Sequence, residues 1–205
     1  VLAWFFFARL DAFLQVQAQL AQLANAPGAT QSVAAPLVGT VALILMMLVP
    51  IFTMRLIAEE RRNQTLVMLM ASPIRSWQIV LGKFLGLLLF LLLVIAACML
   101  MLLVMALGTH LDLGLLLSNA LGLLLLAAAY TALGLYFSAL TPQPIVAAAS
   151  TLAMLFGLWL ADMGAADNDM VLRALTPTSH FQSFNEGLLR STDILYFALF
   201  ITLFL

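Results

Sequence analysis

Residues 55–83 read RLIAEERRNQTLVMLMASPIRSWQIVLGK and lie between two long apolar runs. They hold five of the eight Lys and Arg residues of the chain. A charged segment between two runs long enough to cross a bilayer is a loop that faces water, and an excess of Lys and Arg in a short loop is typical of the cytoplasmic side. We therefore expect a cytoplasmic loop here, from which the rest of the chain can be placed.

The composition indicates a membrane protein, because 65% of the 205 residues are hydrophobic and only 8% are charged. Soluble domains are about 25% charged, and an outer-membrane barrel would show short alternating segments instead of continuous apolar runs. We predict an all-α fold, that of a polytopic helical membrane protein. The net charge of −1 argues against a nucleic-acid partner, and the single Cys98 indicates neither a disulfide nor a cysteine metal site.

The apolar runs predict six transmembrane helices within a single membrane domain, residues 1–205. The expected complete spans are 37–58, 79–107, 113–137 and 145–161, and the expected partial spans are 1–8 and 194–205. A helix over 37–58 is about 33 Å long, enough for the bilayer core. The segments between the spans are a cytoplasmic coupling loop, 59–78, and exterior segments, 9–36 and 162–193.

The charges and one proline add detail to this topology. The cytoplasmic side carries five cations and the exterior side three, as the positive-inside rule requires. Lys83 lies one turn inside its span and can extend toward the lipid headgroups. Pro50 lies inside the span 37–58, where proline removes a backbone hydrogen bond and usually kinks the helix. Pro50 is therefore a candidate hinge, with a static kink as the alternative.

These residues give little basis for catalysis. His110, His180 and Asp162 fall in predicted exterior segments or at their borders, without metal-ligand spacing on one helix, so surface histidines are the favoured interpretation. The chain has no Gly-x-x-x-x-Gly-Lys-Ser/Thr phosphate loop, and the centres of its spans have no carboxylates for ion coupling. We expect no catalytic, cofactor-binding or metal-binding residue on this chain. If the protein moves a substrate, we expect the energy to enter from outside the spans.

The cytoplasmic loop has the parts of a docking element. Its charged residues can pair with one another and with a partner, a short helix can follow, and an apolar knob on that helix suits a groove on a soluble protein. The alternative is a solvated turn whose apolar face rests on lipid. The candidate docking residues are Glu59, Glu60, Arg61, Arg62, Thr65, Leu66, Leu69, Met70, Ser72 and Pro73.

Two stretches of the sequence resemble a known family. The first stretch consists of Glu59-Glu60, then residues 61–74, which include Pro73, and then Gly82-Lys83. This stretch resembles the permease subunits of the ABC-2 type transporter family. The family pattern there is Glu-Glu, Gly-Thr-Leu-Glu-x-Leu-Leu, Pro and Gly-Lys, and this chain has Gln64 where Gly is usual. The second stretch, residues 175–196, resembles the exterior segment before the last span in the subgroup associated with gliding motility.

The resemblance implies an ABC-2 (type V exporter-like) permease architecture. A transporter of this kind has two permeases of six spans each and two cytoplasmic ATPase subunits. The loop from Glu59 to Arg75 would hold the coupling helix that docks on the ATPase, and residues 162–193 would form re-entrant or amphipathic helices. The second and fifth spans would line the dimer interface.

The function implied is that of a permease subunit, which exports a substrate across the bacterial cytoplasmic (inner) membrane. ATP and Mg²⁺ would be bound by a partner ATPase and no cofactor by this chain. The expected partners are that ATPase, a second permease copy in a homodimer, and membrane lipids, with no nucleic acid. Two alternatives stay open: a membrane anchor or assembly factor that recruits an ATPase without transport, and a membrane-embedded hydrolase that uses the two histidines with Asp162.

Overall fold

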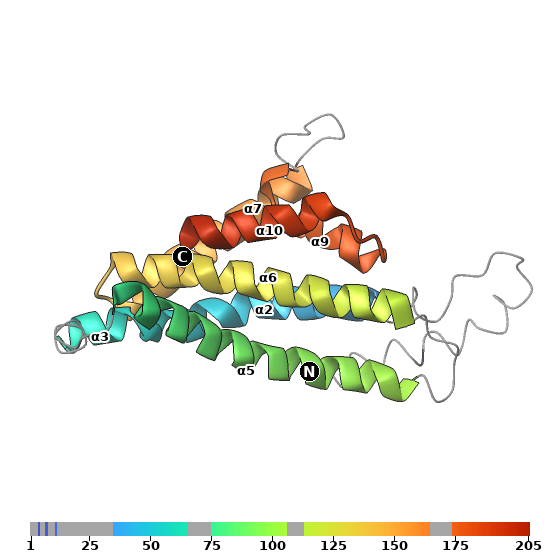
Figure 1. The fold of residues 1–205 in the computed structure, drawn as a ribbon, viewed down its shortest axis with the longest axis horizontal. Coiled ribbons are helices and arrows are strands. Elements are labelled where there is room, and N and C mark those ends of the chain that lie inside the picture. The colour runs from blue at the N-terminus through green and yellow to red at the C-terminus, as the bar shows by residue number, and fades with distance from the viewer. Residues whose placement is uncertain are drawn as a thin grey trace, which may run out of the picture.

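The computed structural model describes residues 35–64, 75–105, 113–164 and 174–205, together with Trp4, Phe7 and Asp11. In these ranges the regular secondary structure is helical and contains no strand, so the predicted all-α fold is confirmed (Figure 1). The helices are α2 (Ala35–Leu56), α3 (Ala58–Arg62), α5 (Ser76–Met105), α6 (Leu113–Leu140), α7 (Pro144–Gly164), α9 (Pro177–Asn185) and α10 (Ser191–Phe204).

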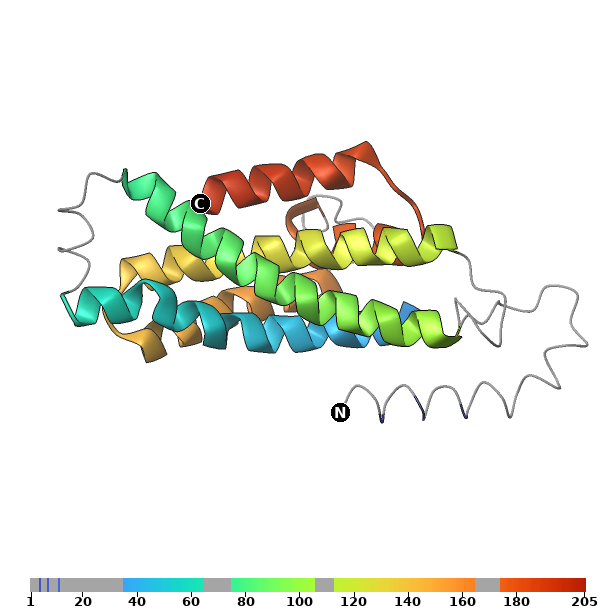
Figure 2. The same cartoon turned by 60° about the horizontal axis from the view of Figure 1, so that its bottom comes forward.

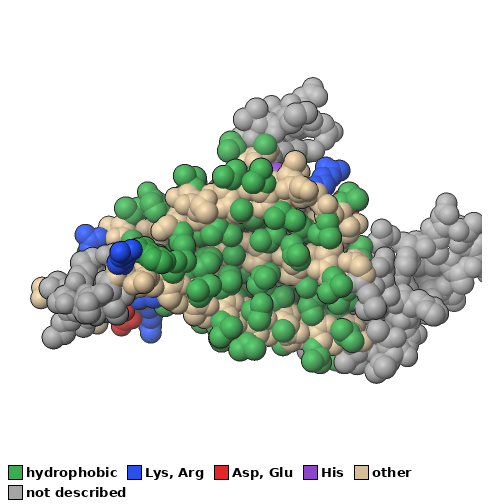
Figure 3. Space-filling model, in the orientation of Figure 1, with side chains coloured by type: hydrophobic (Ala, Val, Ile, Leu, Met, Phe, Trp, Pro, Cys, Tyr) green, Lys and Arg blue, Asp and Glu red, His purple; other side chains and the backbone are tan. Residues whose placement is uncertain are grey.

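Within the described residues, four helical segments are long and apolar enough to cross a membrane, namely Ala35–Arg62, Trp77–Leu103, Gly114–Leu140 and Pro144–Gly164. Apolar side chains cover the middle of the molecule, whereas charged side chains gather toward its ends (Figure 3). This distribution is expected of a helical bundle in a bilayer, because a charge at the bilayer centre is costly. The expected span over residues 1–8 lies outside the described residues apart from Trp4 and Phe7, so the count of six spans stays a prediction.

Helix α6 lies at the centre of the bundle and contacts α2, α5, α7, α9 and α10. Successive long helices run in opposite directions, which brings α3 and the inner turns to one end of the bundle (Figures 1 and 2). We call this end, formed by α3, the start of α5, the end of α6 and the start of α7, the α3 end. The opposite end, with α9 and the starts of α6 and α10, is the α9 end.

Helices α2 and α6 approach closely at Gly134, where an added Cβ would lie 2.3 Å from Thr53 Oγ1. Small residues permit such approaches between membrane helices. Thr53 lies one turn after Pro50, and its hydroxyl donates a hydrogen bond to the Val49 carbonyl oxygen at 3.0 Å. Helix α2 continues through Pro50 to Leu56, so its last turn is held directly against the backbone of α6.

At the α9 end, α9 is held against α6 in a similar way. A Cβ added to Gly122 would lie 2.6 Å from Phe184 Cβ, and the hydroxyl of Ser118 donates to the Phe184 carbonyl oxygen at 2.9 Å. Phe181 and Phe184 are buried in this contact region. The predicted exterior segment therefore contains a helix that packs onto the centre of the bundle.

Candidate functional site

The candidate site is the α3 end, where the charged loop joins the spans. Helix α3 has five residues and no side-chain cap from its own N-cap residue, Ile57. The first N–H groups of a helix need acceptors from elsewhere. The buried hydroxyl of Ser138, on α6, accepts hydrogen bonds from the backbone N–H groups of Ala58 at 3.0 Å and Ile57 at 3.2 Å. It donates to the Met54 carbonyl oxygen at 3.4 Å, so one side chain joins α2, α3 and α6.

Arg61 provides a second link between α3 and α6. Its Nη1 donates to the carbonyl oxygens of Ala139 at 2.8 Å and Leu140 at 3.4 Å. The last carbonyls of a helix have no partner within the helix and carry a negative partial charge, which a guanidinium group stabilises. Arg61 is thus occupied within the chain, although the sequence suggested that it would pair with its neighbours or with a partner protein.

Lys83 provides a link between α3 and α5. Its ammonium group contacts the carboxylate of Glu60 and the carbonyl oxygen of Leu56. The Lys83 side chain is only 16% exposed and the Glu60 side chain is only 29% exposed. The sequence suggested that Lys83 can extend toward the headgroups, and the fold places a carboxylate and a helix-terminal carbonyl group beside its ammonium group. Helix α3 is therefore fastened to α5 and α6 and is continuous with α2.

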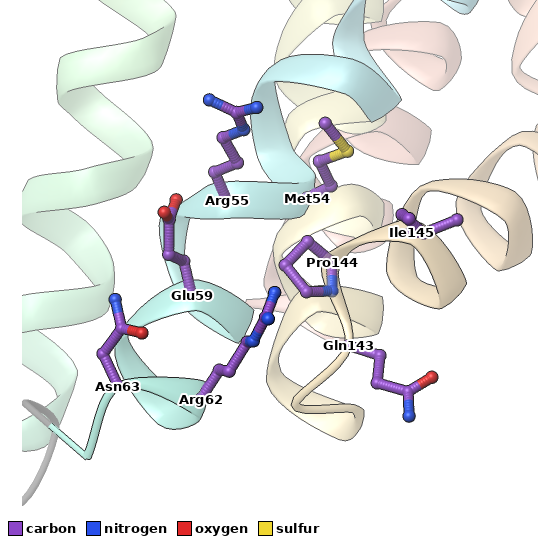
Figure 4. A pocket seen from close by; sticks show the side chains of 8 residues that line it. All are labelled: Met54, Arg55, Glu59, Arg62, Asn63, Gln143, Pro144 and Ile145. Atoms are coloured by element: carbon purple, nitrogen blue, oxygen red, sulfur yellow. The ribbon is translucent and has the colours of Figure 1, made fainter.

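Three further charged residues of this region, Arg55, Glu59 and Arg62, border a cavity of about 570 Å³ between α2–α3 and the start of α7. Arg55, Glu59, Arg62 and Asn63 approach it from the α2–α3 side, and the other wall comes from the α6–α7 turn (Figure 4). We call it the Arg55–Arg62 cavity. Its lining residues are Met54, Arg55, Glu59, Arg62, Asn63, Gln143, Pro144 and Ile145.

Gln64 has a backbone φ of +57°, in the left-handed region that favours glycine. This is the position where the resemblance to the ABC-2 family placed a glycine, so the backbone conformation gives a physical reason for that preference. The structure describes the base of the loop up to this residue. The other candidate docking residues, Thr65, Leu66, Leu69, Met70, Ser72 and Pro73, lie outside the described residues.

At the α9 end, the structure pairs His180 with a residue that the sequence had not singled out. His180 Nδ1 lies 2.7 Å from Oδ1 of the buried Asp193, and its ring stacks on Tyr196 with centroids 4.0 Å apart. His180 Nε2 lies 3.2 Å from the Ala174 carbonyl oxygen. Asp162 instead accepts a hydrogen bond from the Thr176 hydroxyl at 3.0 Å.

The hydrolase alternative therefore has no specific support at the α9 end. That alternative grouped the two histidines with Asp162. In the structure His180 contacts Asp193, Asp162 accepts a hydrogen bond from Thr176, and His110 lies outside the described residues. Asp193 was missed because it stands 13 residues from His180 with no repeating pattern between them. In the part of the chain that the structure describes, no three His, Cys, Asp or Glu residues are grouped as metal ligands.

These features define a polytopic helical membrane protein in which α3, at the base of a charged loop, is hydrogen-bonded to α6 and ion-paired with α5. The sequence matches the family described as ABC-2 family transporter protein over residues 11–183, and the chain belongs to this family. It is thus a membrane component of a transporter, and the predicted ABC-2 relationship is confirmed. Comparisons with curated proteins and with solved structures gave no match. The gliding-motility subgroup stays a prediction.

Proposed function

We propose that this chain is the permease subunit of an ATP-binding cassette transporter, which exports a substrate across the bacterial inner membrane. ATP and Mg²⁺ are bound by separate cytoplasmic ATPase subunits, and the subgroup is the one associated with gliding motility. Family membership supports this proposal. The observation that carries it is the fastening of α3, since a loop that receives a push must be rigidly joined to the spans that move.

The loop after α3 is the coupling element. Leu69 and Met70 form an apolar knob for a groove on the ATPase, while Thr65, Leu66, Ser72 and Pro73 shape the helix that carries it, with Glu59 on its rim. Glu60 and Arg61 have a different role: they fasten the base of the loop to Lys83 and to the end of α6. A push on the loop then moves the inner ends of α2, α5 and α6 as one unit.

A second copy of the permease completes the translocation path. Only 17% of the α7 span is buried within a single chain, against 67% of the α6 span, so α7 has the larger free surface for a homodimer contact. Helices α2 and α7 line that interface in the proposal. If α2 bends at Pro50, its last turn moves together with α6, because Thr53 packs directly against Gly134.

The test is co-purification of the full-length protein from its native membrane, beside Leu69→Asp and Arg61→Ala variants. We expect the wild type to bring down an ATPase subunit and Leu69→Asp to lose it. Arg61→Ala should keep the ATPase but lose ATP-driven transport, because docking survives while the link to α6 does not. Arg75→Ala is the control, since its exposed side chain makes no hydrogen bond or ion pair within the described residues.

Two outcomes contradict the proposal. If wild-type protein yields no ATPase in mild detergent, even with a non-hydrolysable nucleotide, the chain is not an ABC permease of this kind. If an ATPase is recovered but ATP changes neither the spacing of spin labels on α2 and α7 nor transport, the chain is a membrane anchor that recruits the ATPase.

A further inference from the structure

The Arg55–Arg62 cavity combines a positive charge with an apolar border. Its lining contains two guanidinium groups and one carboxylate, from Glu59, which leaves one positive charge in excess. The side-chain amides of Asn63 and Gln143 provide further hydrogen-bond donors. Helix α7 begins at the opposite wall with Pro144, and the N-terminus of a helix carries a positive partial charge.

The two arginines differ from the other cations of the α3 end. Arg61 and Lys83 are already held by α6 carbonyl groups and by Glu60. Within the described ranges, neither Arg55 nor Arg62 makes a side-chain hydrogen bond or ion pair, and both border the same cavity. Two guanidinium groups on one cavity, with only one carboxylate among them, suit an anion that accepts several hydrogen bonds, such as a phosphate group.

The position of the cavity, at the end of a span and beside apolar side chains, indicates that such an anion belongs to a lipid. Arg55 lies in the last turn of α2, within the segment Ala35–Arg62 that can span the membrane. The apolar side chains beside it are open: Ile145 is 80% exposed and Ile51 is 52% exposed. Exposed apolar groups directly next to two cations match the arrangement of the two parts of a phospholipid.

A separate apolar groove lies further along the same two helices. It has a volume of about 430 Å³ and is lined by Thr40, Leu43, Ile44, Met46, Met47, Leu48, Phe156 and Trp159. On α2, Met47 lies seven residues before Met54 of the cavity, which is two helical turns on nearly the same face. On α7, Phe156 lies eleven residues after Ile145, which is about three helical turns on nearly the same face, so the groove and the cavity lie along one seam between α2 and α7.

We infer that the Arg55–Arg62 cavity binds the phosphate of an anionic phospholipid from the cytoplasmic leaflet. Arg55 and Arg62 hold the phosphate, Asn63 and Gln143 donate to headgroup oxygens, and an acyl chain lies along the α2–α7 seam, between this chain and the second permease copy of the proposed function. A soluble partner would not require the apolar part of this site, and an acidic protein surface would have to reach the level of the last membrane turn. The inference does not depend on whether an ATPase binds the loop.

The test is thermal unfolding of the full-length protein in a neutral detergent, with phosphatidylglycerol, phosphatidylcholine or inorganic phosphate added separately. We expect phosphatidylglycerol to raise Tm by about 5 °C at saturating concentration, and we expect no comparable shift with the other two. The double variant Arg55→Gln/Arg62→Gln should lose this shift. Arg75→Gln, which removes a cation of the same end outside the cavity, should keep it.

A second measurement covers the case in which the glutamine variant folds poorly. Lipid phosphorus retained after delipidation should fall in Arg55→Gln/Arg62→Gln and remain in Arg55→Lys/Arg62→Lys, which keeps both charges. An equal shift with phosphatidylcholine, a shift with inorganic phosphate alone, or retention of the shift by the glutamine variant each overturns the inference. It is also overturned if the glutamine variant loses its ATPase partner but still responds to phosphatidylglycerol, because the arginines then serve a protein contact.

Discussion

The hydroxyl oxygen of Ser138 lies 3.0 Å from the backbone nitrogen of Ala58, although the two residues are 80 positions apart in the chain. This hydrogen bond places the end of α6 directly on the first turn of α3, at the base of the charged loop. Helix α3 is joined in this way to α6 as well as to α2. The same relationship makes the α3 end sensitive to substitutions that would be neutral on a free surface.

Ser138→Ala should lower the free energy of unfolding by about 1–2 kcal/mol, because the N–H groups of the buried Ala58 and the half-buried Ile57 lose their acceptor. The measurement is thermal unfolding in detergent followed by circular dichroism. Ser150→Ala is the matched control, since the Ser150 hydroxyl bonds only to carbonyl groups of its own helix, at 2.9 Å from Val146 and 3.0 Å from Ala147. Equal effects of the two substitutions would show that the Ser138 link adds nothing.

Gly134→Ala should destabilise the protein by about 1–3 kcal/mol, because the added methyl group collides with Thr53 in a close helix contact. The same unfolding assay measures this. Gly157→Ala on α7, where nothing lies within 4 Å of the added Cβ, should have little effect. The double variant Gly134→Ala/Thr53→Ala should recover part of the loss, and a loss that is unchanged in the double variant would argue against this contact.

His180→Ala should also destabilise the protein, by about 1–3 kcal/mol, because it leaves the carboxylate of Asp193 buried without its partner. Asp193→Ala should show a comparable loss. The two losses should not add in the double variant, since each single substitution removes the same interaction. Additive losses would mean that His180 and Asp193 act separately.

The predicted orientation can be tested with single cysteines in a Cys98→Ala background, because Cys98 is the one cysteine of the chain and is buried. Gln143 and Glu186 are both exposed, at the α3 end and the α9 end respectively. A membrane-impermeant maleimide should label Glu186→Cys in intact cells and Gln143→Cys only after the membrane is permeabilised. The opposite pattern would reverse the topology and place the charged loop outside.

The sequence predicted the all-α membrane class and the four complete spans because both depend on local composition. A run of about 20 apolar residues crosses a bilayer whatever its neighbours are. The two prolines of the turn after α6, and the charges after α2, likewise mark segment ends without reference to the rest of the fold. For the same reason, the loop pattern was sufficient to indicate the ABC-2 family.

Contacts between different helices of the bundle could not be predicted from local composition. Lys83 has Glu60 as its partner, Ser138 caps α3 and His180 pairs with Asp193, and in each case the partner comes from a different helix. Nearly every face of these helices is apolar, so hydrophobic periodicity does not say which face meets which neighbour. The register between helices, which decides these pairings and opens the Arg55–Arg62 cavity, arises from the packing of small residues such as Gly134 against specific side chains. Composition alone thus predicted a membrane protein, whereas the close packing of helices around α6 determined which of the few polar groups pair with one another.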